Sequence, residues 1–155
     1  MLQSESNVLV AKSKLSSEDL LFVHEFEDLS LDSAKFNHEG HLRIAFIYFT
    51  LHDKQSAVES IETGIKRYAE SLGVADKFHR TITFALAQVV HNRIEMLFER
   101  LKHPVIWSEF LKVNQDILHN ALTILESHYS RDLLFSDKAR KNILLPDKTF
   151  AYRDN

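Results

Sequence analysis

The chain contains no cysteine and has very few glycine and proline residues. Without thiols, disulfides, thiolate catalysis and cysteine-ligated zinc or iron–sulfur centres are all excluded. Only three glycines and two prolines stand among 155 residues, whereas a chain with many strands needs more turn residues. The composition therefore favours helices joined by short loops, folded as one domain over residues 1–155.

Charge and hydropathy narrow the functional classes further. The formal net charge of −3 argues against a nucleic-acid partner, because such binders normally carry a basic face. The N-terminal stretch lacks a basic region followed by an apolar one, so no signal peptide is expected. The longest apolar run, in residues 42–51, is interrupted by Arg43 and is too short to span a bilayer. We therefore expect a cytoplasmic protein that does not bind membranes.

Capping residues and apolar periodicity predict an all-α, up-and-down bundle of about five helices, followed by a short helical turn and an extended tail. Residues 1–15 are polar and are expected to be flexible. Ser56 and Glu59 form a capping box that opens the third helix, and Asp76 caps the fourth. The expected helices cover about 17–29, 38–52, 57–72, 77–102 and 105–128, and the short turn lies near 136–141.

Nine histidines are the strongest chemical signal in the chain. On helical wheels drawn at about 100° per residue, four of them face the core near helix ends. These are His38, His41, His79 and His128. In an up-and-down bundle, the starts of the second and fourth helices share one end with the finish of the fifth. We therefore expect the four side chains to converge, while His91 and His119 face solvent.

Three converging neutral imidazoles make a good site for zinc, iron or copper. The pattern predicts a mononuclear metal site with His38, His41 and His79 as ligands. His128 would be a fourth ligand or a hydrogen-bond donor to one. An open coordination position would admit water or a substrate, which would make the protein a metalloenzyme acting on a small molecule. Two nearby helix N-termini would favour an anionic substrate.

Two other interpretations of the histidines stay open. The first is a polar, hydrogen-bonded end of the bundle without metal, in a non-enzymatic interaction module such as a homodimer. The second is a pocket for an anion or another small ligand. The H-E-x-x-H motif, the paired E-x-x-H motifs of di-iron bundles and glycine-rich phosphate loops are all absent from the sequence.

Two polar side chains fall on expected core faces of the helices. Arg93 lies on the apolar side of the fourth helix and is expected to pair with an acid such as Glu62, or to mark an interface. Asn114 faces inward on the fifth helix and is expected to bond to a backbone carbonyl.

Four segments resemble, in the same order, a group of small, largely uncharacterised bacterial proteins. They are FNHEGHLRIAFIYF, GIKRYAE, KFHRTITFALAQ and HYSRDLLFSDKARKNILLPD. That group shows F-x-H-x-x-H-L, Y-H-E-T-like and Y-S-x-x-x-L-F-S motifs. The resemblance covers about 36–147 and implies a helical fold without assigning an activity. His38, His41 and His79 match the motif histidines, and Arg80 stands where the group has glutamate.

Overall fold

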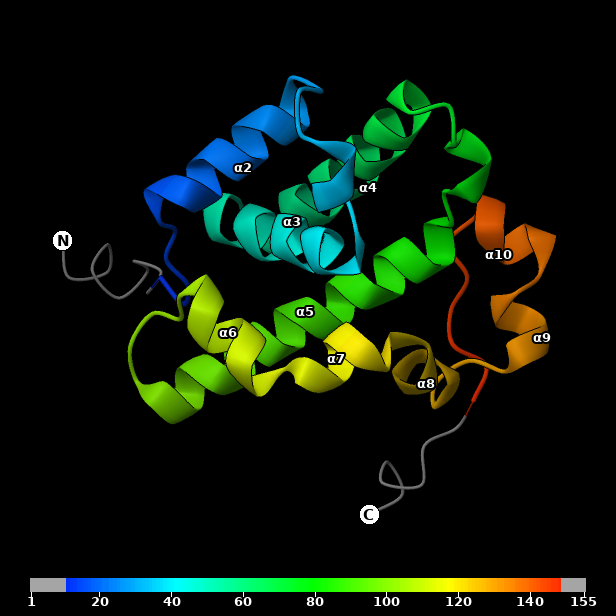
Figure 1. Ribbon diagram of the computed structural model, residues 1–155. Coiled ribbons are helices and arrows are strands. Elements are labelled where there is room, and N and C mark those ends of the chain that lie inside the picture. Colours follow the sequence, from blue (N-terminus) through cyan, green and yellow to red (C-terminus); the bar gives the residue numbers. More distant parts are fainter. Residues whose placement is uncertain (1–10, 149–155) are drawn as a thin grey trace, which may run out of the picture.

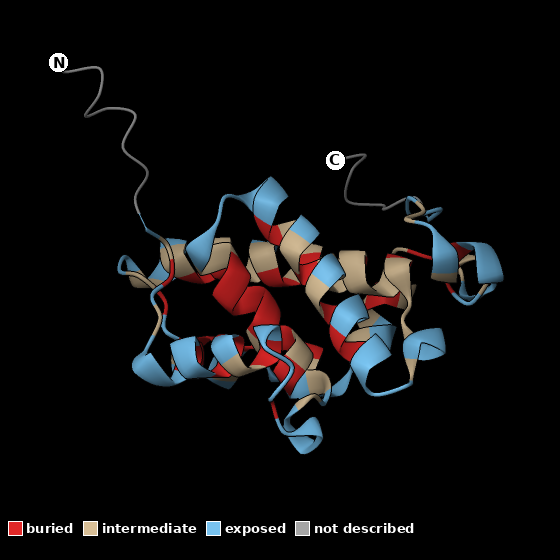
Figure 2. Ribbon diagram, turned by 90° about the horizontal axis from the view of Figure 1, so that it is seen from above, coloured by how far each residue is buried: buried red, intermediate tan, exposed pale blue. Residues whose placement is uncertain are grey.

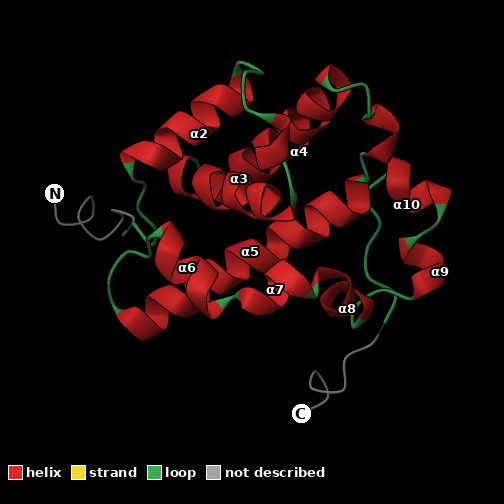
Figure 3. Cartoon of the chain, viewed as in Figure 1, coloured by secondary structure: helices red, strands yellow, loops and turns green. Residues whose placement is uncertain are grey.

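The computed structural model describes residues 11–148, and every regular element within that range is a helix (Figures 1 and 3). The expected all-α fold is confirmed. Successive long helices reverse direction along the chain, as an up-and-down arrangement requires (Figure 1). Within the same range no helix combines the length and the apolarity needed to cross a bilayer.

The elements follow one another with short connections. The α-helices are α2 (Ser17–Glu27), α3 (His38–Leu51), α4 (Lys54–Ser71), α5 (Arg80–Leu101), α6 (Trp107–Val113), α7 (Gln115–His119), α8 (Ala121–Glu126), α9 (Arg131–Leu134) and α10 (Asp137–Lys141). Two 3₁₀ turns, η1 (Ser33–Lys35) and η2 (Ala75–Lys77), lead into α3 and α5.

Two helices begin at caps other than those expected. Asp53, rather than Ser56, caps α4, because its Oδ1 accepts from the backbone N–H of Ser56 at 2.9 Å. The cap of α5 is His79, whose Nδ1 accepts from the backbone N–H of Ile82 at 3.1 Å. Asp76 lies in η2 instead. Histidine is an unusual N-cap, so composition alone does not indicate this start.

The single helix expected over 105–128 is wrong, because the chain breaks there into α6, α7 and α8. The breaks fall at Asn114 and Asn120, whose ψ angles of 37° are not helical. Asn114 donates from Nδ2 to the carbonyl of Phe110 at 2.8 Å, as expected. Asparagine side chains compete with the helix for backbone groups, which explains why the helix ends at this point.

Arg93 pairs with an acid, as expected, but the acid is Asp116 and not Glu62. Arg93 reaches from α5 to the break between α6 and α7, where it donates to Asn114 Oδ1 at 2.7 Å and to Asp116 Oδ2 at 2.8 Å. Glu62 pairs with Arg80 instead. Arg93 therefore ties the interrupted segment to α5.

The N-terminal arm is joined to the loop before α6. The backbone N–H of Lys14 donates to the carbonyl of Val105 at 2.9 Å, and the backbone N–H of Val105 donates to the carbonyl of Lys12 at 2.9 Å. Of the stretch expected to be flexible, residues 1–10 lie outside the described part of the chain.

The core follows the inward faces of the long helices, with exposed residues on the outer faces and at the ends (Figure 2). An aromatic cluster of Phe26, Phe36 and Tyr68 fills the space between α2, α3 and α4, with ring centroids 4.3–6.1 Å apart. Gly64 on α4 permits this approach, since a Cβ there would lie 2.7 Å from the Phe26 ring.

Candidate functional site

A pocket of about 400 Å³ lies between α3, α4 and the first half of α5. This volume falls within the ~300–1,000 Å³ range of small-molecule sites. Its inner part is formed by apolar side chains that are almost completely buried. They are Ala45, Ile61, Ala87 and Val90. Two of them are alanines, which leave the space between the three helices unfilled.

Polar side chains gather at the other end of the pocket. They are His38, His41, Lys77, His79 and Thr83. The chain leads from α4 through η2 straight into α5, so the finish of α4 and the start of α5 lie together. Phe36, just before α3, packs on Tyr68 near the finish of α4 at 4.3 Å between centroids. The first turns of α3 and α5 therefore share this end, and the pocket is polar at one end and apolar at the other.

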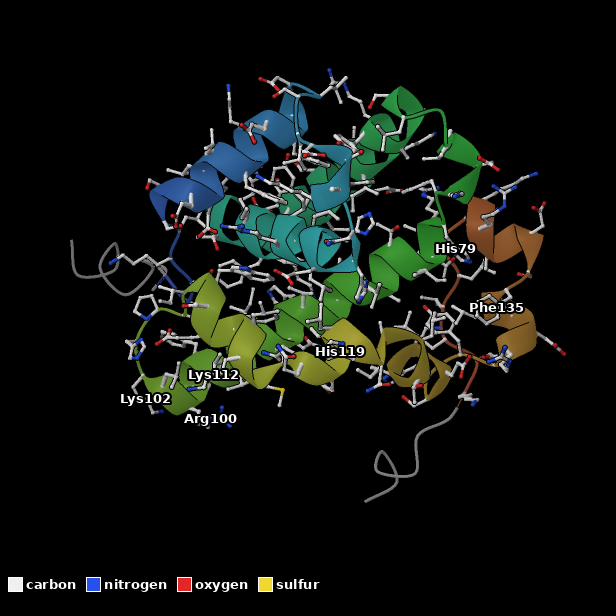
Figure 4. All side chains as sticks on the ribbon, viewed as in Figure 1. His79, Arg100, Lys102, Lys112, His119 and Phe135 are labelled. Carbon is white, nitrogen blue, oxygen red and sulfur yellow. The ribbon has the colours of Figure 1, made fainter. Side chains whose placement is uncertain are left out.

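His79 is fully engaged by the protein. Figure 4 shows it where α5 begins, beside the C-terminal segment that carries α9 and α10. Its Nδ1 accepts from Ile82, so its proton is on Nε2, which donates to the carbonyl of Leu134 at 2.8 Å. His79 thus caps a helix and ties the C-terminal segment to α5.

His38 and His41 differ in their hydrogen bonds. His38 donates from Nε2 to the carbonyl of Ile117 at 2.8 Å, which joins α3 to α7. The ring of His41 packs against the edge of Phe36 at 4.3 Å between centroids and has no hydrogen bond to any described residue. Burial, and secondly the nearby His38, lower the pKa of His41 to about 4. His41 is therefore a neutral imidazole with nitrogens available to a ligand.

The pocket brings together three of the four predicted metal ligands. His38, His41 and His79 line it, but His128 does not. Nδ1 of His79 is engaged as an acceptor, and Nε2 of both His38 and His79 points its proton at a carbonyl. Within residues 11–148, no three His, Cys, Asp or Glu side chains are grouped as a metal site would need. This arrangement does not fit a three-histidine centre unless the two engaged rings turn.

The wheel placed His91 on the solvent side, which is only partly correct, because its side chain is 22% exposed and its Nε2 lies 3.7 Å from Glu95 Oε2. Its ring packs on Phe49 at 5.0 Å between centroids. Its Nδ1 is buried without a hydrogen-bond partner in the described part of the chain. Burial lowers the pKa of His91. His119, in contrast, is exposed on α7, away from His79 (Figure 4).

Sequence reasoning missed Lys77 and Phe78, which line the pocket from η2 and its junction with α5. Phe78 directly precedes His79, and Lys77 directly precedes Phe78. Their closeness in the sequence to a predicted ligand was the signal that could have identified them. They escaped attention because α5 was expected to begin at Lys77, which would have placed both inside a helix.

Comparison with models of known protein families, with curated proteins and with solved structures gave no match to this chain. The resemblance to the bacterial group therefore stays a prediction.

Proposed function

We propose that the protein binds a small, mainly apolar molecule in the pocket between α3, α4 and α5, with His41 as its principal polar contact. The observation that carries this proposal is a cavity of about 400 Å³ lined by one imidazole that has no hydrogen bond to any described residue. At the ~30 Å³ that one water molecule occupies in the liquid, this space suits a ligand of about a dozen non-hydrogen atoms.

Burial of the ligand would supply most of the affinity. The inner walls are aliphatic, so transfer of an apolar body from water is favourable by about 25 cal/mol per Å². A neutral imidazole can donate one hydrogen bond and accept another. His41 would therefore fix the orientation of the ligand without the cost of burying a charge.

Binding fits His41 better than proton abstraction does. A general base works best when its pKa lies near the working pH. With a pKa of about 4, the imidazole of His41 is too weak a base to take a proton efficiently at neutral pH.

Titration with 1-naphthol, a neutral fluorescent probe with one hydroxyl group, tests this proposal. We expect saturable binding to the wild type and its loss in Ala87→Leu, which fills the inner end of the pocket. The matched control is Ala121→Leu on α8, outside the pocket, which should bind like the wild type. Equal binding by folded Ala87→Leu would contradict the proposal.

The mononuclear metal site predicted from the sequence is a second candidate, favoured by the common position of His38, His41 and His79. Metal content measured after exposure to micromolar zinc tests it. The informative variant is His41→Ala, because this ring makes no hydrogen bond that the fold requires. Zinc bound by the wild type and lost in the variant would support a metal centre, and no zinc in either would rule out a zinc centre.

The homodimer predicted as the alternative is a separate proposal. Its test is the molecular mass of the protein in solution, measured over a range of concentrations. A mass that stays at one chain, 18.0 kDa, would exclude it.

A further inference from the structure

Lys77 is the one permanently charged side chain among the described residues that line the pocket. The lining also contains three histidines but no aspartate or glutamate. Lys77 is exposed, and its ammonium group forms no ion pair or hydrogen bond with any described residue. The chain as a whole is acidic, with a net charge of −3, so the charge at this pocket is opposite in sign to that of the chain.

The cation stands at the polar end of the pocket. Lys77 ends η2, two residues before the cap of α5. The first turn of α3 contributes His38 and His41 to the same end. The N-termini of both helices carry partial positive charge, which adds to the charge of Lys77. The opposite end, around Ala87 and Val90, is wholly apolar.

We infer that the ligand is an amphiphile with one acidic headgroup, held at the end formed by Lys77 and His41, with its apolar body directed toward Ala87 and Val90. This inference rests on the proposed function and adds the chemical class of the ligand. A carboxylate would accept from the ammonium group of Lys77 and from a ring N–H of His41, both charge-assisted hydrogen bonds. A cationic headgroup would meet like charge and no acceptor of opposite charge in the lining.

Calorimetric titration of the full chain with decanoate, 1-decanol and decylammonium tests this class, since the three probes share one apolar chain. Below their micellar concentrations, we expect decanoate to bind roughly fivefold more tightly than 1-decanol, as a partly exposed ion pair allows. Decylammonium should bind most weakly. Near ~1 M salt, where the screening length is ~3 Å, the advantage of decanoate should shrink.

The variant Lys77→Met should remove most of the preference for decanoate, leaving the part that His41 supplies, and should leave the affinity for 1-decanol unchanged. Its matched control, Lys66→Met, changes an exposed lysine of α4 outside this pocket and should keep the preference.

Two outcomes would overturn the inference in different ways. If 1-decanol binds as tightly as decanoate and Ala87→Leu blocks both, the acidic class is wrong and the proposed function stands. If no probe binds saturably, both fail.

Discussion

The two faces of α4 meet very different surroundings. Toward α2, Gly64 and Tyr68 pack against the rings of Phe26 and Phe36, beside a groove of about 320 Å³ whose rim carries Glu27, Glu59 and Arg67. Toward α5, the same helix borders a pocket of about 400 Å³ with mainly apolar walls. One helix thus carries a face largely filled by aromatic rings, with a polar groove beside them, and a face left open to an apolar pocket.

The difference arises from side-chain size and from polar groups. Aromatic rings fill the side toward α2, and the hydroxyl of Tyr68 is satisfied by the carbonyl of Leu31 at 2.5 Å. On the side toward α5, alanines at 45, 69 and 87 leave volume unfilled, and the His41 ring forms no hydrogen bond with any described residue. Protein interiors normally have packed volume and satisfied polar groups. The pocket combines unfilled volume with an unengaged imidazole, and the proposed ligand site rests on this combination.

The largest effect should come from removing an aromatic ring on the filled face. Phe26 is 1% exposed, and Phe26→Ala should lower the free energy of unfolding by about 3–5 kcal/mol. Ile82→Ala, on the wall of the pocket, should lower it by less than half as much, since that side chain already borders open space. Urea unfolding of both variants measures the difference. Equal losses would mean that the two faces are packed alike.

The second effect is a dependence of stability on pH, which arises from His41 on the pocket side. The pKa of His41 is about 4 in the folded chain, against 6.5 for an unperturbed histidine. Between these pH values the unfolded chain binds more protons, so stability is complete above pH 6.5 and falls as the pH drops toward 4. A pKa difference of this size changes the free energy of unfolding by roughly 3 kcal/mol once the pH has fallen below both values.

Substitution separates His41 from other titrating groups, including His91, whose lowered pKa acts in the same direction. Unfolding followed from pH 7 to pH 4.5 should show a flatter dependence for His41→Gln than for the wild type. His119→Gln, at an exposed position on α7, is the matched control and should follow the wild type. A His41→Gln profile that follows the wild type would show that this ring is not buried in its neutral form.

A smaller effect should come from adding volume to each face. In Gly64→Ala, the new Cβ would lie 2.7 Å from the Phe26 ring. Overpacking costs about 1–3 kcal/mol and the helix gains about 1 kcal/mol, so a net loss of about 1 kcal/mol is expected. Ala87→Leu adds three carbons but enters open space, and it should change the free energy of unfolding by less. The reverse order, measured by thermal unfolding, would contradict the comparison.

The helical fold and the meeting of three histidines could be predicted from the sequence. Core-facing positions follow from periodicity, and the common end of His38, His41 and His79 follows from antiparallel neighbours. Their hydrogen bonds could not be predicted, because the acceptors are backbone carbonyls of Ile117 and Leu134, far along the chain.

The errors have a shared physical origin. A wheel assumes one regular helix and a uniform environment around it. It therefore missed the breaks at Asn114 and Asn120, and it did not show that Phe49 of α3 packs against the partly exposed ring of His91. The pocket itself depends on absent volume at alanine positions, which a sequence does not distinguish from close packing of small residues.

The smallest predicted effect is a difference between two hydroxyl groups. One belongs to Tyr68, on the side of α4 toward α2, and the other to Thr83, in the pocket between α4 and α5. Tyr68→Phe removes a buried donor and leaves the carbonyl of Leu31 without that partner, which should cost about 1 kcal/mol. The Thr83 hydroxyl lines the pocket and forms no hydrogen bond with any described residue. Thr83→Val should therefore change the free energy of unfolding by less than ~0.5 kcal/mol. Chemical unfolding of both variants in parallel measures the contrast, and a larger loss for Thr83→Val would mean that its hydroxyl is held by the fold and is not available to a ligand.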